Sequence, residues 1–503
     1  MKTIKAAITI LISSHLSFIN SSAQERLMDS LYYRAEFQTT LASGDYNPLW
    51  LNANRYGLSS LKTGNGYLRG AIERPLSADD GRKWGIGYGL DAALAAGFTS
   101  TLVVQQVYVE GRWLKGTLTV GAKEQPMELK NTELSSGPQT LGINARPVPQ
   151  VRMALPDYWS IPGTKNWLAL KGHIAFGKTT DDNWQKDFTH SQSRYTEGTL
   201  YHSKAGYLKI GPKNITATVG IEMASQFGGK SYLFEDGEQQ VYENEGGIKG
   251  MMHALFYGGS DPVDGSFKNN EGNQLGSLLA RFDIDQPDWS LGVYADQFFE
   301  DYSMMVHVNK SGDGYFAYGF KDWMLGAELQ LKHSPWLRGV VLEYLYTKYQ
   351  GGPVYHDQTP NIPIQISGRD NYYNHHLFTG WQHWGQVMGN PLYRSPLYNT
   401  DGMVEVKHNR FVAWHLGLNG SPAERWDYRV LATWQKSYGS YYHVPAHPEE
   451  NLSLMTEVAY RFPLAGWAVK GTLGLDSGKL RGNNWGVQVS MVKTGLLNFK
   501  KQR

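Results

Sequence analysis

The chain has 503 residues, with 48 lysines and arginines against 46 aspartates and glutamates, which gives a formal net charge of +2. This near balance argues against a nucleic-acid binder, and the absence of cysteine excludes disulfide scaffolds, cysteine-ligated metals and a thiol nucleophile. A mean hydropathy of −0.44, with no long apolar stretch beyond the N-terminus, excludes a helical membrane protein.

The N-terminal residues have the pattern of an export signal. Lys2 and Lys5 precede a short apolar stretch over 8–19, and small residues then precede Gln24. This order predicts a signal peptide over 1–23, leaving 24–503 as one mature domain. The apolar stretch is too short for a permanent anchor, and no cysteine follows it to carry a lipid.

Apolar and polar residues alternate along most of the mature chain, as in half-buried strands that have one apolar and one polar face. In the first such segment, every second residue belongs to one face of the predicted strand, and the residues between them belong to the other. The residues of the first face are Leu31, Tyr33, Ala35, Phe37, Thr39 and Leu41. Later segments follow the same rule, among them 86–94, 214–223, 289–296, 323–332 and 485–491. About eighteen such segments recur, each about ten residues long, which is the length of a tilted strand that crosses a bilayer.

The connections between these segments alternate between short and long. Tight turns rich in proline or glycine lie at 211–213, 286–288 and 463–466. Long polar connections lie between them, at 224–276, 298–322, 349–409 and 437–452. Aromatic residues sit at the ends of the apolar faces, as in an interfacial girdle: Trp289, Trp323, Trp467, Trp485, Tyr460 and Phe462.

These features together predict an all-β fold. We expect a closed, antiparallel transmembrane β-barrel of about 18 strands in the outer membrane, with short periplasmic turns and long outer loops. Closure removes the unpaired strand edges that a large open sheet would expose to lipid. The stretches 45–61 and 122–150 do not alternate, and we leave them open as inner plugs, periplasmic turns or short helices.

Enzyme signatures are scarce. The sequence contains no H-E-x-x-H, no G-x-S-x-G and no P-loop motif, so we expect a protein that is not an enzyme. His375, His376 and His383 lie near Asp370, but adjacent histidines on a strand point in opposite directions, which disfavours a metal site. We therefore expect no cofactor and no metal, while a Ser/His hydrolase barrel stays open as a minor alternative.

The segment 369–399 mixes flat aromatic rings with asparagine, glutamine, histidine and arginine. Carbohydrate recognition needs this mixture, because rings stack on the apolar face of a sugar while amides and guanidinium groups bond its hydroxyls. Ordinary loop packing is the alternative, since barrels are rich in tryptophan and tyrosine in any case. The polysaccharide contacts that we predict are Arg369, Tyr372, Tyr373, Trp381, His383 and Trp384.

A second unusual stretch contains Arg146, which follows Asn144 and precedes Pro147 and Pro149. Pro147 and Pro149 force extended backbone, which favours a rigid structural turn. Arg146 could face the lumen and fix the fold, or meet an acidic polymer, and we favour the structural role.

Three ordered motifs resemble those of the Wzi family of capsule assembly proteins. The first is Pro48-Leu49-Trp50-Leu51 with Asn54-Arg55-Tyr56-Gly57, and the second is Asn144-Ala145-Arg146-Pro147-Val148-Pro149-Gln150. The third runs from Gly380-Trp381 to Gly385 and continues as Gly389-Asn390-Pro391-Leu392. The resemblance implies an outer-membrane barrel with a lectin-like role, which helps attach or organise capsular polysaccharide at the cell surface.

The partners expected from this resemblance are a surface polysaccharide and outer-membrane lipid. Whether binding also relies on the polysaccharide export machinery stays open. Two other functions also stay open, namely a passive porin or sugar channel and, less favoured, a barrel that hydrolyses lipid or glycan. Binding to a repeating polymer would combine many weak contacts through multivalency.

Overall fold

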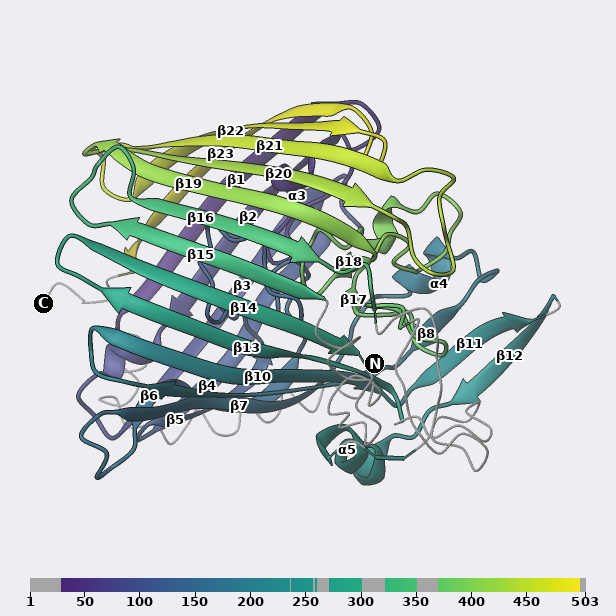
Figure 1. The fold of residues 1–503 in the computed structure, drawn as a ribbon, viewed down its shortest axis with the longest axis horizontal. Helices are drawn as coiled ribbons and strands as arrows, with labels where there is room; N and C mark the ends of the chain where they lie inside the picture. Colours follow the sequence, from purple (N-terminus) through teal and green to yellow (C-terminus); the bar gives the residue numbers. More distant parts are fainter. Residues whose placement is uncertain are drawn as a thin grey trace, which may run out of the picture.

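The computed structural model describes residues 29–235, 237–256, 258–259, 271–300, 322–350 and 370–497. The predicted signal peptide lies outside these residues. The main feature is an 18-stranded antiparallel sheet (Figure 1). β1 pairs with β2 on one side and with β23 on the other, from Leu31 opposite Leu497 to Ser43 opposite Trp485. The sheet is therefore a closed barrel, as the alternation predicts.

The barrel strands are β1 (Leu31–Ser43), β2 (Gly64–Arg74), β3 (Trp84–Ala96), β4 (Leu102–Trp113), β5 (Gly116–Ala122), β6 (Gln150–Ser160), β7 (Leu168–Lys178), β9 (Leu200–Ile210), β10 (Ile215–Phe227), β13 (Asn273–Asp285), β14 (Trp289–Glu300), β15 (Trp323–Leu331), β16 (Gly339–Tyr346), β19 (Phe411–Ala423), β20 (Trp426–Ser437), β21 (Glu449–Arg461), β22 (Trp467–Gly478) and β23 (Asn484–Leu497). The remaining elements are β8 (Tyr195–Glu197), β11 (Lys230–Glu235), β12 (Glu238–Glu243), β17 (Gln382–His383), β18 (Gln386–Val387), α3 (Leu49–Asn52), α4 (Trp184–Phe188), α5 (Gly247–Phe256), and the 3-10 turns η2 (Leu76–Asp79) and η3 (Pro396–Tyr398).

Each barrel strand has an apolar outer face and a mixed inner face. On β16, for example, the Leu342 side chain is 47% exposed on the outside, whereas its neighbour Glu343 is fully buried inside. Leu41 and Phe37 likewise point outward from β1. This apolar exterior is stable only in lipid, and the chain is an outer-membrane β-barrel. No helix in the described ranges has the length and apolar character needed to cross a membrane.

The two ends of the barrel differ as the connections predict. Short turns join β9 to β10, β13 to β14 and β21 to β22 at one end, which we call the inner end. The start of β1 and the end of β23 lie there as well. Long segments leave the other, outer end, where α4, α5 and the small β8-β11-β12 sheet lie (Figure 1). Aromatic side chains ring the inner end, including Trp84, Trp113, Trp289, Trp426, Tyr460, Phe462 and Trp467.

The lumen is filled by three segments that enter from the outer end. We call 44–63, 123–149 and 370–410 the first, second and third plug segments. The two stretches that do not alternate are therefore inner plugs and not periplasmic turns, and the first of them also contains the short helix α3. Leu49, Trp50 and Leu51 of α3 belong to a large buried cluster that also contains Tyr372, Trp381 and Leu392 of the third segment. The barrel core is thus formed between the wall and its plug.

Candidate functional site

Buried polar groups on the wall hold the second plug segment in place. The Glu343 carboxylate accepts hydrogen bonds from the Ser135 hydroxyl at 2.5 Å and the Ser136 amide at 2.8 Å. Asp296 forms a buried ion pair with Lys130, with 2.8 Å between Oδ2 and Nζ. A buried carboxylate needs such partners, because desolvation without them carries a large energetic penalty. The inner face of the wall is therefore built to bind this segment.

The motif residues connect the three plug segments to one another. Asn144 Oδ1 accepts from the Asn54 amide at 3.0 Å, and Asn144 Nδ2 donates to the Val387 carbonyl at 2.9 Å. Asn390 Nδ2 donates to the Gly137 carbonyl at 2.6 Å. Gly57 adopts a φ of +68°, and a Cβ there would come within 2.4 Å of the Arg146 backbone nitrogen. These motif positions thus have a structural role at the junction of the segments.

The other motif residues lie at the same junction. Pro149 and Pro391 offer carbonyl oxygens to the Lys178 amide and to the Arg481 guanidinium. Pro147 lies half-buried on the wall of the lumen cavity described below. Arg55 is half-buried in the first plug segment, and desolvation lowers the pKa of its guanidinium.

Four of the six predicted contact residues lie inside the plug. Tyr372, Tyr373, Trp381 and His383 are buried. Their polar atoms bond protein groups: the Trp381 indole donates to the Thr140 carbonyl at 2.8 Å, and the Tyr373 hydroxyl donates to the Gln139 carbonyl. Arg369 lies outside the described residues. Sequence composition alone did not distinguish a packed plug from an open binding surface.

Trp384 differs from these four residues because it is half-buried at the outer end. It occupies, with Gly385, the two-residue turn between β17 and β18, and both residues have positive φ, at 55° and 77°. Glycine adopts this conformation freely, but a tryptophan there is strained, and such strain is common at functional sites. The hairpin therefore presents the Trp384 ring at the top of the plug.

Arg146 stacks on this ring, with its guanidinium carbon 4.2 Å from the ring centroid. Its nitrogens donate to the Thr99 and Ser100 hydroxyls at 2.8 and 3.2 Å. In the part of the chain that the structure describes, no carboxylate forms an ion pair with Arg146. Burial lowers the pKa of Arg146 to about 10, so the guanidinium stays charged at neutral pH. Among the described residues, no carboxylate therefore serves as its counter-ion.

Trp384 and Arg146 belong to an outer pocket of about 400 Å³. Trp184 and Phe188 from α4 form a further wall, with their rings stacked at 5.0 Å between centroids. Tyr46 of the first plug segment completes the aromatic lining. No sequence pattern pointed to α4 as part of this site, since Trp184 lies far along the chain from Trp384. The pocket combines ring faces with a charged guanidinium, which suits stacking on a sugar and bonding to its hydroxyl or carboxylate oxygens.

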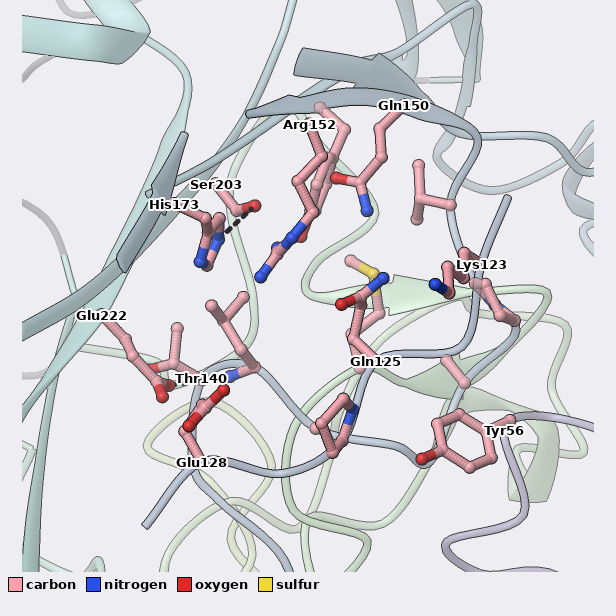
Figure 2. Close-up of a pocket in the computed structure, with 18 of the residues that line it drawn as sticks. Tyr56, Lys123, Gln125, Glu128, Thr140, Gln150, Arg152, His173, Ser203 and Glu222 are labelled. Carbon is pink, nitrogen blue, oxygen red and sulfur yellow. Dashed lines mark hydrogen bonds between the residues drawn. The ribbon is translucent and has the colours of Figure 1, made fainter. Parts of the chain in front are cut away.

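Below the outer pocket lies a lumen cavity of about 100 Å³, and Arg146 lines both spaces. Figure 2 shows this cavity between the plug and β6, β7, β9 and β10, with Arg152, His173, Ser203 and Glu222 projecting from the strands. His173 Nε2 lies 3.1 Å from the Ser203 hydroxyl. A space of this size holds only a few water molecules.

A polar vestibule of about 710 Å³ opens at the inner end of the barrel. Glu133 of the second plug segment lies on its wall, together with Arg429, Glu457 and Lys470 from the strands. The Glu133 carbonyl accepts from the Arg429 guanidinium at 3.0 Å, which ties the plug to the wall here. The vestibule therefore ends against the plug.

The fold is similar to that of known outer-membrane barrels. Wzi of Escherichia coli, an outer membrane protein involved in group 1 capsule assembly and described as a carbohydrate-binding β-barrel, is 13% identical, with a TM-score of 0.55 over 94% of this chain and 86% of that chain. OccK3 of Pseudomonas aeruginosa is 11% identical, with a TM-score of 0.46 over 94% of this chain and 98% of that chain. OprD of the same organism is 10% identical, with a TM-score of 0.44 over 93% of this chain and 95% of that chain. No protein-family model matches the sequence, and no curated protein matches it. The likeness to Wzi is one of fold, and this chain has the fold of an 18-stranded outer-membrane barrel.

Proposed function

We propose that this protein is a non-enzymatic polysaccharide-binding protein of the outer membrane, which helps attach or assemble capsular polysaccharide at the cell surface. One observation carries the proposal: Trp384, Trp184 and Arg146 line one pocket at the outer end of a plugged barrel, and no carboxylate of the described residues pairs with Arg146. The motif resemblance to the Wzi family and the carbohydrate-binding description of the E. coli structure support it.

Within this proposal, Trp384 contacts the polymer directly. Tyr372, Tyr373, Trp381 and His383 act as positioning residues, because their rings and polar atoms hold the third plug segment under the pocket. Arg146 has two roles, since it supports the Trp384 ring and presents a charged donor. This assignment refines the six contacts predicted from sequence and gives Trp184 a place beside them.

Binding is tested with the purified protein in detergent and the purified surface polysaccharide of the source strain. We expect Trp384→Ala and Trp184→Ala each to weaken binding about fivefold, since loss of one aromatic stack removes about 1 kcal/mol. Tyr442→Ala is the matched control, because Tyr442 is an exposed aromatic residue of another outer loop. Equal affinities for all three variants and the wild type would remove the pocket from the proposal.

The cellular role is tested by the distribution of polysaccharide between cells and medium. We expect deletion of the gene to leave synthesis intact and to release polymer into the medium, and the Trp384→Ala variant to release part of it. A cell-bound polymer of unchanged amount would contradict the capsule role while leaving the barrel fold untouched.

A passive channel is the second candidate function, favoured by the polar vestibule and the lumen cavity. The dense packing of the plug argues against it, because the lumen cavity has a volume of only about 100 Å³. Single-channel recording in planar bilayers distinguishes the two functions. Steady conductance of the intact wild-type protein would favour the channel, and its absence together with polymer binding would favour the attachment role.

A further inference from the structure

Helix α5 lies against the outside of the barrel wall near the outer end (Figure 1). Its buried residues are Gly250 and Ala254, four positions apart, so one side of the helix meets the wall. A Cβ at position 250 would come within 3.2 Å of the Phe227 ring, and glycine therefore permits the close approach. Lys204 on β9 donates to carbonyl oxygens of the last turn, which lack intrahelical partners.

The alternation along β9 and β10 shows that this contact is external. Ser203 and Glu222 line the lumen cavity, so their side chains point inward. Lys204 is the neighbour of Ser203, and Phe227 lies an odd number of residues from Glu222, so both point outward. Helix α5 therefore covers a part of the wall that would otherwise face the surroundings of the barrel.

The side of α5 that faces away from the wall is apolar. Ile248, Met251, Met252 and Phe256 are 82%, 36%, 47% and 70% exposed. Their spacing of three, four and eight residues places them on one face of the helix. Lys249 lies on a polar flank, where its ammonium pairs with Glu245 at 2.7 Å. The helix thus combines a buried side, an exposed apolar side and a charged flank.

The strand register places the end of α5 at the level of the lipid. Lys204 lies opposite Met223, eight residues from the start of β10 at Ile215. A strand tilted by about 40° climbs roughly 20 Å over eight residues, within an apolar belt about 25 Å tall. Val219 and Ile174, on the wall below, are exposed to this belt. The apolar face of α5 continues the lipid-facing surface of the barrel.

We propose that α5 is an interfacial helix, which places Ile248, Met251, Met252 and Phe256 among the acyl chains of the outer leaflet. The occupant is lipid, because the exposed face adjoins the established lipid interface and its charged flank can stay in water. Phe256, in the turn beside Lys204, lies deepest, and Ile248 lies nearer the headgroups. The helix would fasten the long connection between β10 and β13 to the membrane surface. This inference does not rest on polysaccharide binding.

The absence of cysteine in the chain allows a direct test with single-cysteine variants carrying an environment-sensitive fluorophore. The labelled positions are Phe256→Cys and Ile248→Cys, with Val219→Cys as the lipid-facing control and Lys249→Cys as the water-facing control. Each protein is reconstituted in phosphatidylcholine vesicles containing lipids brominated on the acyl chain, and aqueous iodide serves as the second quencher. Resistance of the unheated protein to unfolding in SDS confirms that each variant is folded.

We expect the probe at position 256 to be quenched by brominated lipid as strongly as the probe at 219, and to be protected from iodide. The probe at 248 should be quenched more weakly by lipid but still more than the probe at 249. Quenching of 248 and 256 by iodide alone would show a helix in water and overturn the proposal. Protection of both positions from both quenchers would also overturn it, because protein and not lipid would then cover this face.

Discussion

The barrel wall and the plug inside it are stabilised in different ways, and β16 shows the contrast in two adjacent residues. Leu342 points to lipid, while Glu343 points inward and bonds Ser135 and Ser136 of the second plug segment. The wall repeats one backbone ladder through 18 strands, so no single side chain carries much of its stability. The plug has little regular structure and depends on individual buried polar contacts between distant residues, as between Asn144 and Val387.

The largest expected effect comes from removing the carboxylate on which the second plug segment rests. Glu343→Ala leaves the Ser135 hydroxyl, the Ser136 amide and the Tyr294 hydroxyl without their shared acceptor. We expect the plug to lose about 3 kcal/mol or more of stability. Limited proteolysis of the folded protein should show faster cleavage within 123–149, while the barrel still resists SDS.

Leu342→Ala is the matched control for this variant, because it changes the same strand on its lipid side. We expect the plug of this control to be cleaved at the wild-type rate. Equal cleavage rates for Glu343→Ala and Leu342→Ala would show that the plug does not depend on its polar contact with β16.

A smaller effect on plug stability is expected from a change of pH, because His383 titrates. This residue is buried, its Nδ1 donates to the Arg146 carbonyl at 2.8 Å, and its Nε2 accepts from the Thr180 amide at 3.0 Å. Burial lowers the pKa of His383 from 6.5 to about 4. Between these values the unfolded segment binds more protons than the folded one, so stability falls as pH falls from 6.5 to 4, by about 3 kcal/mol at most.

His383→Gln removes this titration. We expect the plug cleavage rate of the wild type to rise more steeply between pH 6.5 and 4 than that of the variant, with parallel profiles above pH 7. Wild-type and variant profiles that stay parallel over the whole range would assign the acid sensitivity to other groups.

The third expected effect is smaller still and concerns the junction of the plug segments. Asn144→Ala removes two hydrogen bonds, one to the Asn54 amide and one to the Val387 carbonyl, and we expect a loss of about 2 kcal/mol in plug stability. Asn214→Ala, in an exposed turn at the inner end, is the control. If Asn144→Ala left both plug stability and polysaccharide affinity at the level of the control, the junction would lack the structural role that its geometry indicates.

The wall was predictable from sequence because its signal is local. Residues two apart in a strand share a face, so the alternation around Leu31–Leu41 and the tight turn at 286–288 define strands without knowledge of their partners. The structure confirms the number of strands, the closure of the barrel and the grouping of the short turns at one end. The signal peptide over 1–23 and the mature domain over 24–503 stay predictions.

The site was predictable only in part, because composition does not report burial. The third segment was singled out for its aromatic and amide residues, but these residue types suit a packed plug as well as a sugar-binding surface. Trp381 and Tyr373 are buried because the segment folds back into the lumen. Trp184 joins Trp384 only because α4 comes to lie over the third segment, which no local pattern indicates.

The sequence by itself determined the outer-membrane barrel, since period-two alternation and tight turns act between neighbours in the chain. The tertiary structure alone decided which aromatic residues are hidden and which are presented, since that depends on contacts between residues such as Arg146 and Trp384. Those contacts join segments separated by more than 200 residues, and they form only when the closed wall has brought the three plug segments into one lumen.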